Sequence, residues 1–397
     1  MRLLFYYSAE RIFKDPQGNL YASGNFTPEV WERYISIADE LTVVMTDSGR
    51  VIPQEEAQRS KHIIDTKKFD VVLLPDKYTS LKSFFSLKRK RLSDKKEKET
   101  FDKCDFAIIR SANTSVLSRC RKWGIPYAVE VVGCLWDAFW NHSLKGKLMA
   151  PYEFFIAKYN ASKAPYALYV TNEFLQKRYP AKKAVTVSCS DVSLYHLDEK
   201  VLEERIEKIK NHSGTYVLGT AAACNVRYKG QQFVIKALAH LKKQGLENFR
   251  YDVVGSGDPS YLLKVAEKLG VADKVNIVGQ LSHDKVMEWL KSIDLYIQPS
   301  LQEGLPRAVI EAMSMGVPCT GTNIAGMPEL ISEDLLFSCK NVREIASIIK
   351  NLDTEREIKA ANENFQKAKE YDAKLLSHRR AEFYKNFREY AKAHPWH

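Results

Sequence analysis

The chain has 397 residues, of which 45% are hydrophobic and 27% are charged. This length favours two domains or a little more, and the composition is that of an ordinary folded protein, which excludes a disordered chain. No apolar run approaches the roughly 18 to 20 residues that cross a bilayer, and an acid interrupts the opening MRLLFYYSAE where a signal peptide would stay apolar. We therefore expect a cytoplasmic protein.

The formal charge of +11 requires a partner of opposite sign: nucleic acid, an anionic membrane or small phosphates. The densest basic cluster is the region Leu81–Lys98, where Phe84 and Phe85 lie among lysines and arginines. Aromatic side chains beside basic ones are typical of a membrane interface, although an ordinary solvated charge run would look the same. No nucleic-acid-binding motif accompanies the cluster. We expect peripheral binding to the inner face of the cytoplasmic membrane and no nucleic-acid partner.

Seven cysteines occur without any C-x-x-C pair, which indicates reduced thiols and neither a disulfide framework nor a zinc site. The nine histidines form no H-E-x-x-H motif. We therefore expect no metal site and no cofactor.

The first half alternates continuous apolar runs with amphipathic stretches, a pattern that indicates a parallel sheet covered by helices on both faces. Strands are expected at 3–7, 41–46, 69–75, 104–110, 127–133 and 166–171, and helices at 29–40 and 116–124. A polar helix and link follow at 198–214.

The second half repeats the alternation. Strands are expected at 216–222, 249–257, 275–279, 294–300 and 317–323, with helices at 230–245, 259–270, 283–293, 306–315 and 341–352. The sequence thus predicts an α/β protein with two doubly wound domains that face each other across a cleft. We expect the domains at 1–190 and 191–370, with the tail 371–397 as a last amphipathic helix.

Ligands of such sheets bind beyond the carboxyl ends of the strands, so the residues there are candidates for a site. Arg227 and Lys229 follow the first strand of the second half, and two such cations could grip a diphosphate. Gly255 and the nearby Gly257 permit a tight turn after the next strand, with or without a ligand. Val278 and Leu281, around the end of the third strand, could face a planar base.

The stretch QEGLPRAVIEAMSMGVP places Glu303 before a short helix at 306–315 and Glu311 within it. Pro306 suits the first helical position, and Gly316 suits the residue after its end. The N–H groups of such a helix start suit an anion such as phosphate. Solvated acids, one beside the helix dipole and one in a surface salt bridge, would be the simpler interpretation of the two glutamates.

The ordered motifs VRYKG, VVGSGDP, VNIVGQL and DLYIQPSLQEGLPRAVIEAMSMGVPCTGTNIAGMPELI resemble the C-terminal domain of glycosyltransferase family 4. This family consists of retaining enzymes of the GT-B architecture. The likeness covers about residues 216–331.

The resemblance implies a role for each matching residue. Arg227 and Lys229 match the pair that holds the donor diphosphate and replaces a metal ion. Glu303 matches the acid that faces the transferred sugar, and Gly304 and Leu305 match the backbone beside it. Glu311 matches the acid that accepts from the ribose hydroxyls. Members of the family are thought to react on one face of the sugar, with the departing phosphate helping to deprotonate the acceptor.

The first half matches the family less well. Gly24, between Ser23 and Asn25, stands for the small-residue loop that approaches the diphosphate in relatives. The usual histidine is absent near Gly133. Three residues could replace it, Glu130, Asp137 and His142, although a purely structural role is the simpler interpretation of each. Among them we expect Asp137 to be the catalytic residue because it follows a strand end.

Together these features predict a metal-independent retaining glycosyltransferase. It would move a sugar from a UDP- or GDP-linked donor to a glycan or lipid-linked glycan in capsule, O-antigen or exopolysaccharide synthesis. A nucleotide-sugar epimerase or hydrolase of the same architecture and a nonenzymatic sugar-nucleotide binder remain alternatives. Donor turnover without an acceptor would favour the epimerase or hydrolase. Donor binding without turnover would favour the nonenzymatic binder.

Overall fold

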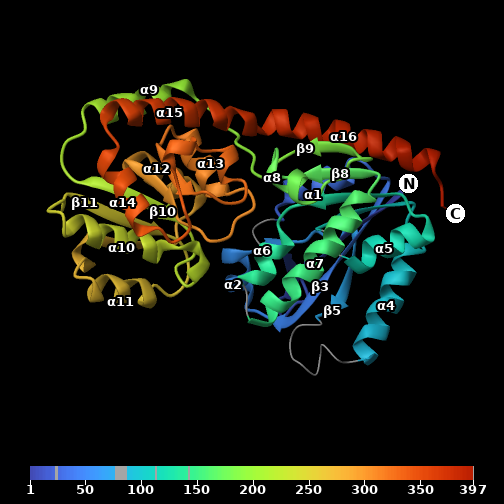
Figure 1. Cartoon of the computed structure of the whole chain (residues 1–397). Helices are drawn as coiled ribbons and strands as arrows, with labels where there is room; N and C mark the ends of the chain where they lie inside the picture. The colour runs from blue at the N-terminus through green and yellow to red at the C-terminus, as the bar shows by residue number, and fades with distance from the viewer. Residues whose placement is uncertain (23–25, 77–86, 112–113, 142–143, 397) are drawn as a thin grey trace.

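The computed structural model describes residues 1–22, 26–76, 87–111, 114–141 and 144–396. They form two halves, each built on its own sheet, as Figure 1 shows. The two doubly wound sheets agree with the architecture expected from the sequence.

The sheet of the first half has its parallel strands in the order β5-β3-β1-β6-β7-β8-β9. A short antiparallel extension, β2 and β4, pairs with the far end of β1 and was not predicted. The strands are β1 (Arg2–Lys14), β2 (Leu20–Ala22), β3 (Glu40–Val51), β4 (His62–Ile63), β5 (Asp70–Pro75), β6 (Phe106–Arg110), β7 (Tyr127–Val131), β8 (Tyr166–Tyr169) and β9 (Val185–Ser188).

Helices cover both faces of this sheet. Leu3 and Phe5 of β1 belong to the buried cluster that includes α1 and the last helix, whereas Leu4 and Tyr6 face the cluster formed with α4, α5 and α7. This alternation explains why β1 is apolar without a break. The helices are α1 (Pro28–Ile35), α2 (Gln54–Ser60), α4 (Leu87–Phe101), α5 (Thr114–Trp123), α6 (Leu135–Trp140), α7 (Leu144–Ser162) and α8 (Phe174–Arg178).

The second half has an all-parallel sheet in the order β12-β11-β10-β13-β14-β15. Its strands are β10 (Tyr216–Ala221), β11 (Phe249–Val254), β12 (Val275–Gly279), β13 (Leu295–Gln298), β14 (Cys319–Thr322) and β15 (Leu336–Phe337). Its helices are α9 (Glu199–Lys210), the short η1 (Arg227–Lys229), α10 (Gln231–Lys242), α11 (Ser260–Lys268), α12 (His283–Ser292), α13 (Arg307–Ser314), α14 (Val342–Asn351) and α15 (Thr354–Ala368).

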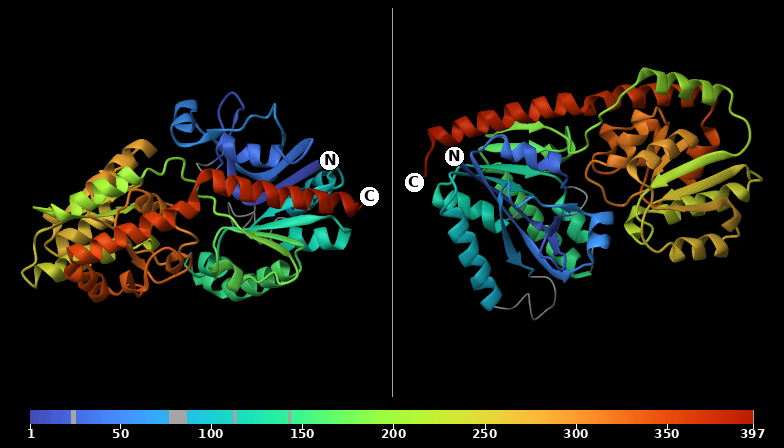
Figure 2. Two further views of the ribbon diagram at one scale, coloured as in Figure 1. Left: turned by 90° about the horizontal axis from the view of Figure 1, so that it is seen from above. Right: turned by 180° about the vertical axis from the view of Figure 1, so that it is seen from behind.

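The chain then returns to the first half. After α15 and a short turn comes α16 (Ala373–Ala393). Asp372 caps it, because the side chain of Asp372 accepts from two backbone N–H groups of the new helix. Figure 2 shows α15 and α16 running along one side of the molecule across both halves. Phe387 of α16 packs against Phe106 and Tyr166 of the first sheet, with ring centroids 5.7 and 5.2 Å apart.

The helix of the acid motif begins one residue later and ends one residue earlier than predicted. Pro306 is extended and caps α13, so it precedes the helix. Val309, Ile310, Ala312 and Met313 of the helix are buried. Gly316 adopts a φ of 62° at the end, as its position predicted.

All seven cysteines are free and six are buried. Among the helices of the described residues, none is long and apolar enough to cross a membrane.

Candidate active site

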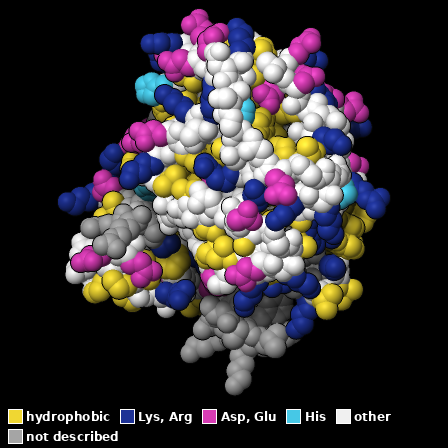
Figure 3. All heavy atoms as spheres, turned by 90° about the vertical axis from the view of Figure 1, so that its left-hand side faces the viewer, with side chains coloured by type: hydrophobic (Ala, Val, Ile, Leu, Met, Phe, Trp, Pro, Cys, Tyr) yellow, Lys and Arg dark blue, Asp and Glu magenta, His cyan; other side chains and the backbone are white. Residues whose placement is uncertain are grey.

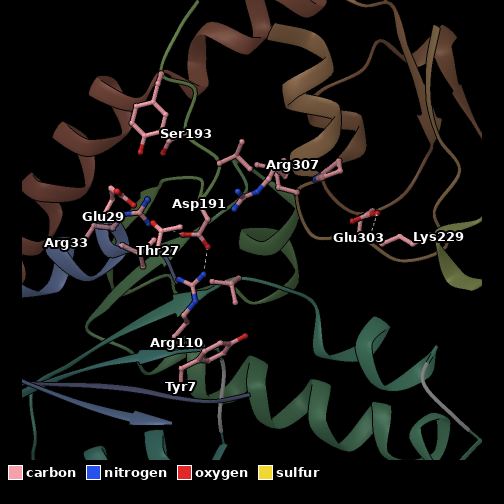
Figure 4. Close-up of a pocket in the computed structure, with 16 residues that line it drawn as sticks. Tyr7, Thr27, Glu29, Arg33, Arg110, Asp191, Ser193, Lys229, Glu303 and Arg307 are labelled. Atoms are coloured by element: carbon pink, nitrogen blue, oxygen red, sulfur yellow. Dashed lines mark hydrogen bonds and ion pairs between the residues drawn. The ribbon is translucent and has the colours of Figure 1, made fainter. Parts of the chain in front are cut away.

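A cavity of about 820 Å³ lies between the two halves (Figure 4). The strand order of the first sheet reverses between β1 and β6, and that of the second between β10 and β13. Ligands of open parallel sheets bind at such reversal points, and here the two points contribute to one cavity. Its walls are formed by Tyr7, Thr27, Glu29, Val30, Arg33, Arg110, Val132, Asp191, Val192, Ser193, Tyr195, Lys229, Glu303, Leu305, Pro306 and Arg307.

Lys229 and Glu303 face each other on the wall that the second half supplies. Lys229 Nζ donates to Glu303 Oε1 at 2.8 Å. The two side chains are 24% and 10% exposed, so the pair is shielded from bulk water yet open to the cavity. The sequence placed these residues 74 positions apart, and the structure brings them together as the motifs predicted.

Gln298, the last residue of β13, holds the carboxylate from the buried side. Its Nε2 donates to Glu303 Oε1 at 3.0 Å, and its Oε1 accepts from the hydroxyl of Tyr296 at 2.8 Å. Gln298 is itself 2% exposed. Because the amide is fixed at both ends, the Glu303 carboxylate has little freedom to rotate away from Lys229.

Gly230 explains how Lys229 reaches this position. Its φ is 82°, and a Cβ there would lie 1.9 Å from the carbonyl oxygen of Pro299. Only glycine allows the turn after Lys229 to approach the loop after β13 so closely. The neighbouring backbone completes the contact, since the N–H of Leu301 donates to the carbonyl of Tyr228 at 2.7 Å.

The start of α13 opens on the same cavity. Leu305, Pro306 and Arg307 line it, and the first N–H groups of an eight-residue helix lie beside them. Gly304 lies where the halves meet, because a Cβ on it would come within 3.2 Å of the carbonyl oxygen of Val132 in the first half. A helix start with an arginine and a lysine nearby suits a phosphate group.

Glu311 lies one turn further along α13 and outside the cavity wall. Its side chain is 14% exposed, and the Nδ1 atom of His283 lies 3.9 Å from its Oε1. Burial raises the pKa of the Glu311 carboxyl, while Arg307 and His283 act in the opposite direction. The acid is therefore at the boundary of the core, as the helical spacing predicted.

Arg227 does not converge with Lys229 on the cavity. Its guanidinium lies over the ring of Tyr261, 4.4 Å from the centroid, and it is absent from the cavity wall. The second cation on this wall is Arg307. In this structure the cations of this wall are thus Lys229 of η1 and Arg307 of α13, in place of the expected pair Arg227 and Lys229.

Gly255 has a structural reason to be glycine. A Cβ on it would lie 2.1 Å from the carbonyl oxygen of Ala222, so the loops after β10 and β11 pack directly on each other. Val278 and Leu281 are partly buried against the core beside this loop. These three residues lie away from the cavity lining, next to the loop that carries Arg227.

The first half supplies a polar wall that the sequence did not reveal. Arg110 ends β6, and its Nη1 lies 2.6 Å from Glu130 while its Nη2 contacts Asp191. Glu130 is 1% exposed and also accepts from the hydroxyls of Tyr34, at 2.9 Å, and Tyr384. Glu130 is therefore a buried anchor for Arg110 and α16 and does not replace the missing histidine.

Asp191 is one of two carboxylates that this wall presents to the cavity, the other being Glu29 of α1. Arg33 lies 3.5 Å from it and Arg380 lies 3.9 Å from it, in addition to Arg110. Although burial acts to raise it, these arginines hold the pKa of Asp191 down at about 2. The group is therefore ionised throughout the neutral range.

Asp137 is not brought to the cavity. It lies in α6, where its Oδ1 is 3.9 Å from Arg178, and it is not part of the cavity wall. Gly24 and His142 lie outside the described residues. In the part of the chain that the structure describes, no group of three or more His, Cys, Asp or Glu side chains could hold a metal ion.

One signal pointed to the missed residues. Arg110 and Asp191 both stand at or just after the carboxyl end of a strand, which is the rule that found Lys229 and Glu303. Neither residue stands in a recognisable motif. Glu130, which holds Arg110, is itself held by Tyr34 and Tyr384, and both tyrosines are distant from it in the chain. The network could therefore not be assembled from the sequence.

The fold resembles solved glycosyltransferase structures over nearly the whole chain. The sucrose-phosphate synthase from Thermosynechococcus elongatus superposes with a TM-score of 0.68 at 12% identity, covering 97% of this chain and 98% of that one. Anabaena Alr3699/HepE in complex with UDP gives a TM-score of 0.64 at 17% identity, covering 96% and 99%. The architecture is therefore GT-B.

The sequence comparisons identify the family. Residues 203–372 match the family described as glycosyl transferases group 1. Protein CapJ of Staphylococcus aureus is 30% identical over 362 residues, which cover 88% of this chain and 85% of CapJ. The amylovoran biosynthesis glycosyltransferase AmsK of Erwinia amylovora is 35% identical over 114 residues, which cover 27% of this chain and 28% of AmsK. The chain belongs to the group 1 glycosyltransferases.

Proposed function

We propose that the protein is a retaining glycosyltransferase of family 4. It transfers a sugar from a nucleotide-diphosphate sugar, UDP- or GDP-linked, to a glycan or lipid-linked glycan acceptor in the synthesis of a cell-surface polysaccharide. The main support is the Lys229–Glu303 pair at the start of α13, inside a cavity that both halves line. In this proposal residues 1–190 bind the acceptor and residues 191–370 bind the donor, except that Asp191, at the boundary between them, faces the acceptor.

Glycosyl transfer passes through an oxocarbenium-like state while negative charge builds on the departing diphosphate. Lys229, Arg307 and the first N–H groups of α13 are fixed charges and dipoles at the place where that charge would develop. This set neutralises the leaving group without a metal ion. Arg227 would join it by leaving the ring of Tyr261.

Glu303 faces the transferred sugar in this arrangement and accepts from its hydroxyls. Its bond to Lys229 couples the sugar contact to the diphosphate contact, because one oxygen of the carboxylate touches the ammonium. Glu311 accepts from the ribose hydroxyls, and the backbone between Val278 and Leu281 lies beside the base. A glycosyl-enzyme intermediate on Glu303 is not required, since the departing phosphate can take the acceptor proton.

The acceptor enters against the wall of the first half. Asp191 is ionised and exposed to the cavity, and Arg33, Arg110 and Tyr7 surround it. These groups can accept from and donate to sugar hydroxyls. Asp191 therefore takes the position in the proposal that the sequence had assigned to Asp137.

The names of the relatives support the pathway class. They include the amylovoran biosynthesis glycosyltransferase AmsK and a protein named as a colanic acid biosynthesis glycosyltransferase, WcaL of Escherichia coli. HepE has been solved with UDP-glucose. We place the protein in the cytoplasm, on the inner face of the membrane, where free thiols such as its seven cysteines stay reduced.

Thermal-shift screening with UDP-, GDP- and ADP-sugars tests the donor, because a ligand that binds the native state raises the Tm. The donor that raises it is then incubated with and without a lipid-linked acceptor, and the anomeric configuration of the product is measured. Retention in an acceptor-dependent product supports the proposal. Turnover without acceptor would instead indicate an epimerase or hydrolase, and a shift without turnover a sugar-nucleotide binder.

A further inference from the structure

Helices α6 and α7 carry an unusual row of exposed apolar side chains. Leu144, Leu148, Tyr152, Phe155 and Tyr159 recur every three or four residues along α7, and they are 84%, 82%, 58%, 65% and 57% exposed. This spacing places them on one face of the helix. Trp140 and Met149, each 41% exposed, extend the row, and we call these seven residues the α7 stripe.

The opposite face of α7 packs against the protein mainly with small side chains, joined by Phe154, whose ring contacts those of Trp136 and Tyr179. Its buried residues are Gly146, Ala150, Ala157, Asn160 and Ala161. A surface helix of a globular protein normally buries its large apolar residues and exposes polar ones. In α7 the arrangement is inverted, so the core does not account for the α7 stripe. A contiguous exposed apolar surface of this kind marks a site of interaction.

Exposed lysines flank the α7 stripe. Lys145, Lys147, Lys158 and Lys163 are all exposed, and three of them lie over aromatic rings: Lys147 over Trp140, Lys158 over Phe154 and Lys163 over Tyr159, at 5.6 to 5.8 Å from the centroids. Glu153 is the one acid within the sequence of α7. Aromatic rings with lysines at their edges suit the boundary between headgroups and acyl chains.

The basic region Leu81–Lys98 is a weaker candidate for the same role. Residues 81–86 lie outside the described residues. In the described part of α4, Ser93, Glu97 and Thr100 are buried, and Arg119 pairs with Asp94 and Glu97. Leu92 is the large apolar side chain that is exposed there. The side chains that the structure describes in α4, residues 91–101, offer charge to a membrane but little apolar area.

We propose that the α7 stripe, with its flanking lysines, is the surface by which this protein docks onto a membrane that contains anionic lipids. The apolar side chains enter the boundary of the acyl chains, and the lysines reach the phosphates around them. α4 belongs to the same helical layer and adds charge at longer range.

A membrane fits this surface better than a second copy of the chain. Two copies that met through the α7 stripe would bring their lysines together, and like charges at an interface oppose association. The formal charge of +11 acts in the same direction. The face of the molecule shown in Figure 3 differs from this surface, because there basic and acidic side chains are interspersed and the hydrophobic ones lie in small groups.

The position of the surface suits a lipid-linked acceptor, and this step rests on the proposed function. Val132 lines the cavity, and α6 begins shortly after it at Leu135. In Figure 1, α6 lies at the end of the first half that faces the second. In the proposal, a membrane held against α7 lies on the side of the first half that α6 connects to Val132, and a lipid-anchored acceptor reaches the cavity along this side.

Vesicle flotation with the full chain tests the proposal. The variant Leu148→Ser/Phe155→Ser is compared with the wild type on vesicles of phosphatidylcholine with and without phosphatidylglycerol. We expect the partition constant on the anionic vesicles to fall at least ~10-fold, because two large side chains leave the acyl boundary. The matched control Val51→Ser/Val185→Ser changes two residues that are 66% and 50% exposed elsewhere in the first half, and it should bind as the wild type does.

Each other outcome overturns the proposal. Wild-type protein that ignores both kinds of vesicle excludes a membrane, and a dimer that the α7 variant dissociates, measured by light scattering, would assign the surface to a second copy. Retained binding by the α7 variant with loss in Lys88→Gln/Arg89→Gln/Lys90→Gln/Arg91→Gln would assign the contact to the basic region. An unchanged Tm of the α7 variant establishes that it is folded.

Flotation needs no turnover, so its result is independent of the donor chemistry. A protein that floats but binds no nucleotide sugar would contradict the proposed function alone. A protein that uses a soluble acceptor but does not float would contradict the membrane surface alone.

Discussion

Lys229 and Glu303 form an ion pair that is shielded on the protein side and open to the cavity. Lys229→Ala removes the ammonium that would meet the departing diphosphate. Of the two side chains that donate to Glu303 Oε1, Lys229 and Gln298, the variant keeps Gln298. We expect kcat/KM for the donor to fall at least ~100-fold, the usual loss for one preorganised electrostatic contact. Steady-state kinetics with a saturating acceptor measure it.

Lys236→Ala is the matched control, since this lysine lies over Phe233 on α10 and does not line the cavity. It should retain wild-type kinetics. Full activity in Lys229→Ala would mean that other cations neutralise the leaving group. A rise in KM without a fall in kcat would mean that Lys229 binds donor and transition state equally.

Glu311 gives a prediction in which stability and binding change in opposite directions. Burial raises the pKa of its carboxyl, with Arg307 and His283 opposing. The folded protein therefore holds this proton more tightly than the unfolded chain, and stability falls as the pH rises through the folded pKa. Glu311→Gln removes that cost, so the Tm without ligand should rise above that of the wild type at pH 7.5.

The same substitution should weaken donor binding about 10-fold, because a hydrogen bond from ribose to a charged acceptor becomes one to a neutral amide. In the wild type the donor Kd should rise as the pH falls through the pKa of Glu311, and in Glu311→Gln this rise should vanish. Calorimetric titrations between pH 5 and 8 measure both. Equal donor affinity in the two proteins would place the ribose elsewhere.

The two walls of the cavity differ in how far the sequence revealed them. Glu303 and Glu311 lie in one short segment, and the strand-end rule gave Lys229, so local patterns sufficed. The wall of the first half depends on Arg110, Glu130 and Asp191, each of which reads as an ordinary polar residue until the sheet and α16 bring them together. Arg227 was expected in the cavity, but its stacking on Tyr261 is a side-chain contact that no spacing specifies.

At the scale of elements, the side chain of one residue joins the two halves of the molecule at the start of a helix. Glu329 of the second half accepts from the backbone N–H groups of Asn172, Glu173 and Phe174 at the start of α8, at 2.6 to 3.1 Å. An acid at a helix start is stabilised by unpaired N–H groups and the helix dipole. Here that acid comes from the other half of the molecule, so the helix cap is also a contact that holds the two halves together.

Glu329→Ala should lower the free energy of unfolding by about 1–2 kcal/mol and weaken the contact between the two halves. We expect the radius of gyration from small-angle scattering to increase, because the halves gain freedom. Glu344→Ala is the matched control: Glu344 accepts from the N–H of Ser338 at 2.5 Å within the second half. It should cost similar stability without expanding the molecule. An unchanged radius in Glu329→Ala would show that other contacts set the separation.

The sequence predicted elements well where a single burial pattern defines them, as in the parallel strands and α13. It missed β2 and β4, which are two or three residues long and depend on the far end of β1 for pairing. The sequence also did not predict the inverted packing of α7. Its small and large residues are both apolar, and only the neighbouring elements decide which side of the helix is buried.

At the scale of the whole molecule, α16 ties the two halves together. It continues from α15 of the second half and buries Phe383, Tyr384 and Phe387 against the first. Tyr384 also reaches the carboxylate of Glu130, which holds Arg110 in the cavity wall. A change in the angle between the halves must therefore act on α16 and on the cavity wall of the first half together.

Phe387→Ala tests this coupling. The side chain is 0% exposed and packs on two rings of the first half, so its loss should cost about 3–5 kcal/mol. Because the contact lies on the first sheet, hydrogen exchange should accelerate in β6–β9 and much less in β10–β14. Phe365→Ala, a buried residue between α15 and α9, is the matched control and should give the reverse pattern. If both variants accelerate exchange equally in both sheets, the halves unfold as one unit. In that case α16 does not connect two halves that unfold independently, and the contacts of α16 with one half would affect the stability of both.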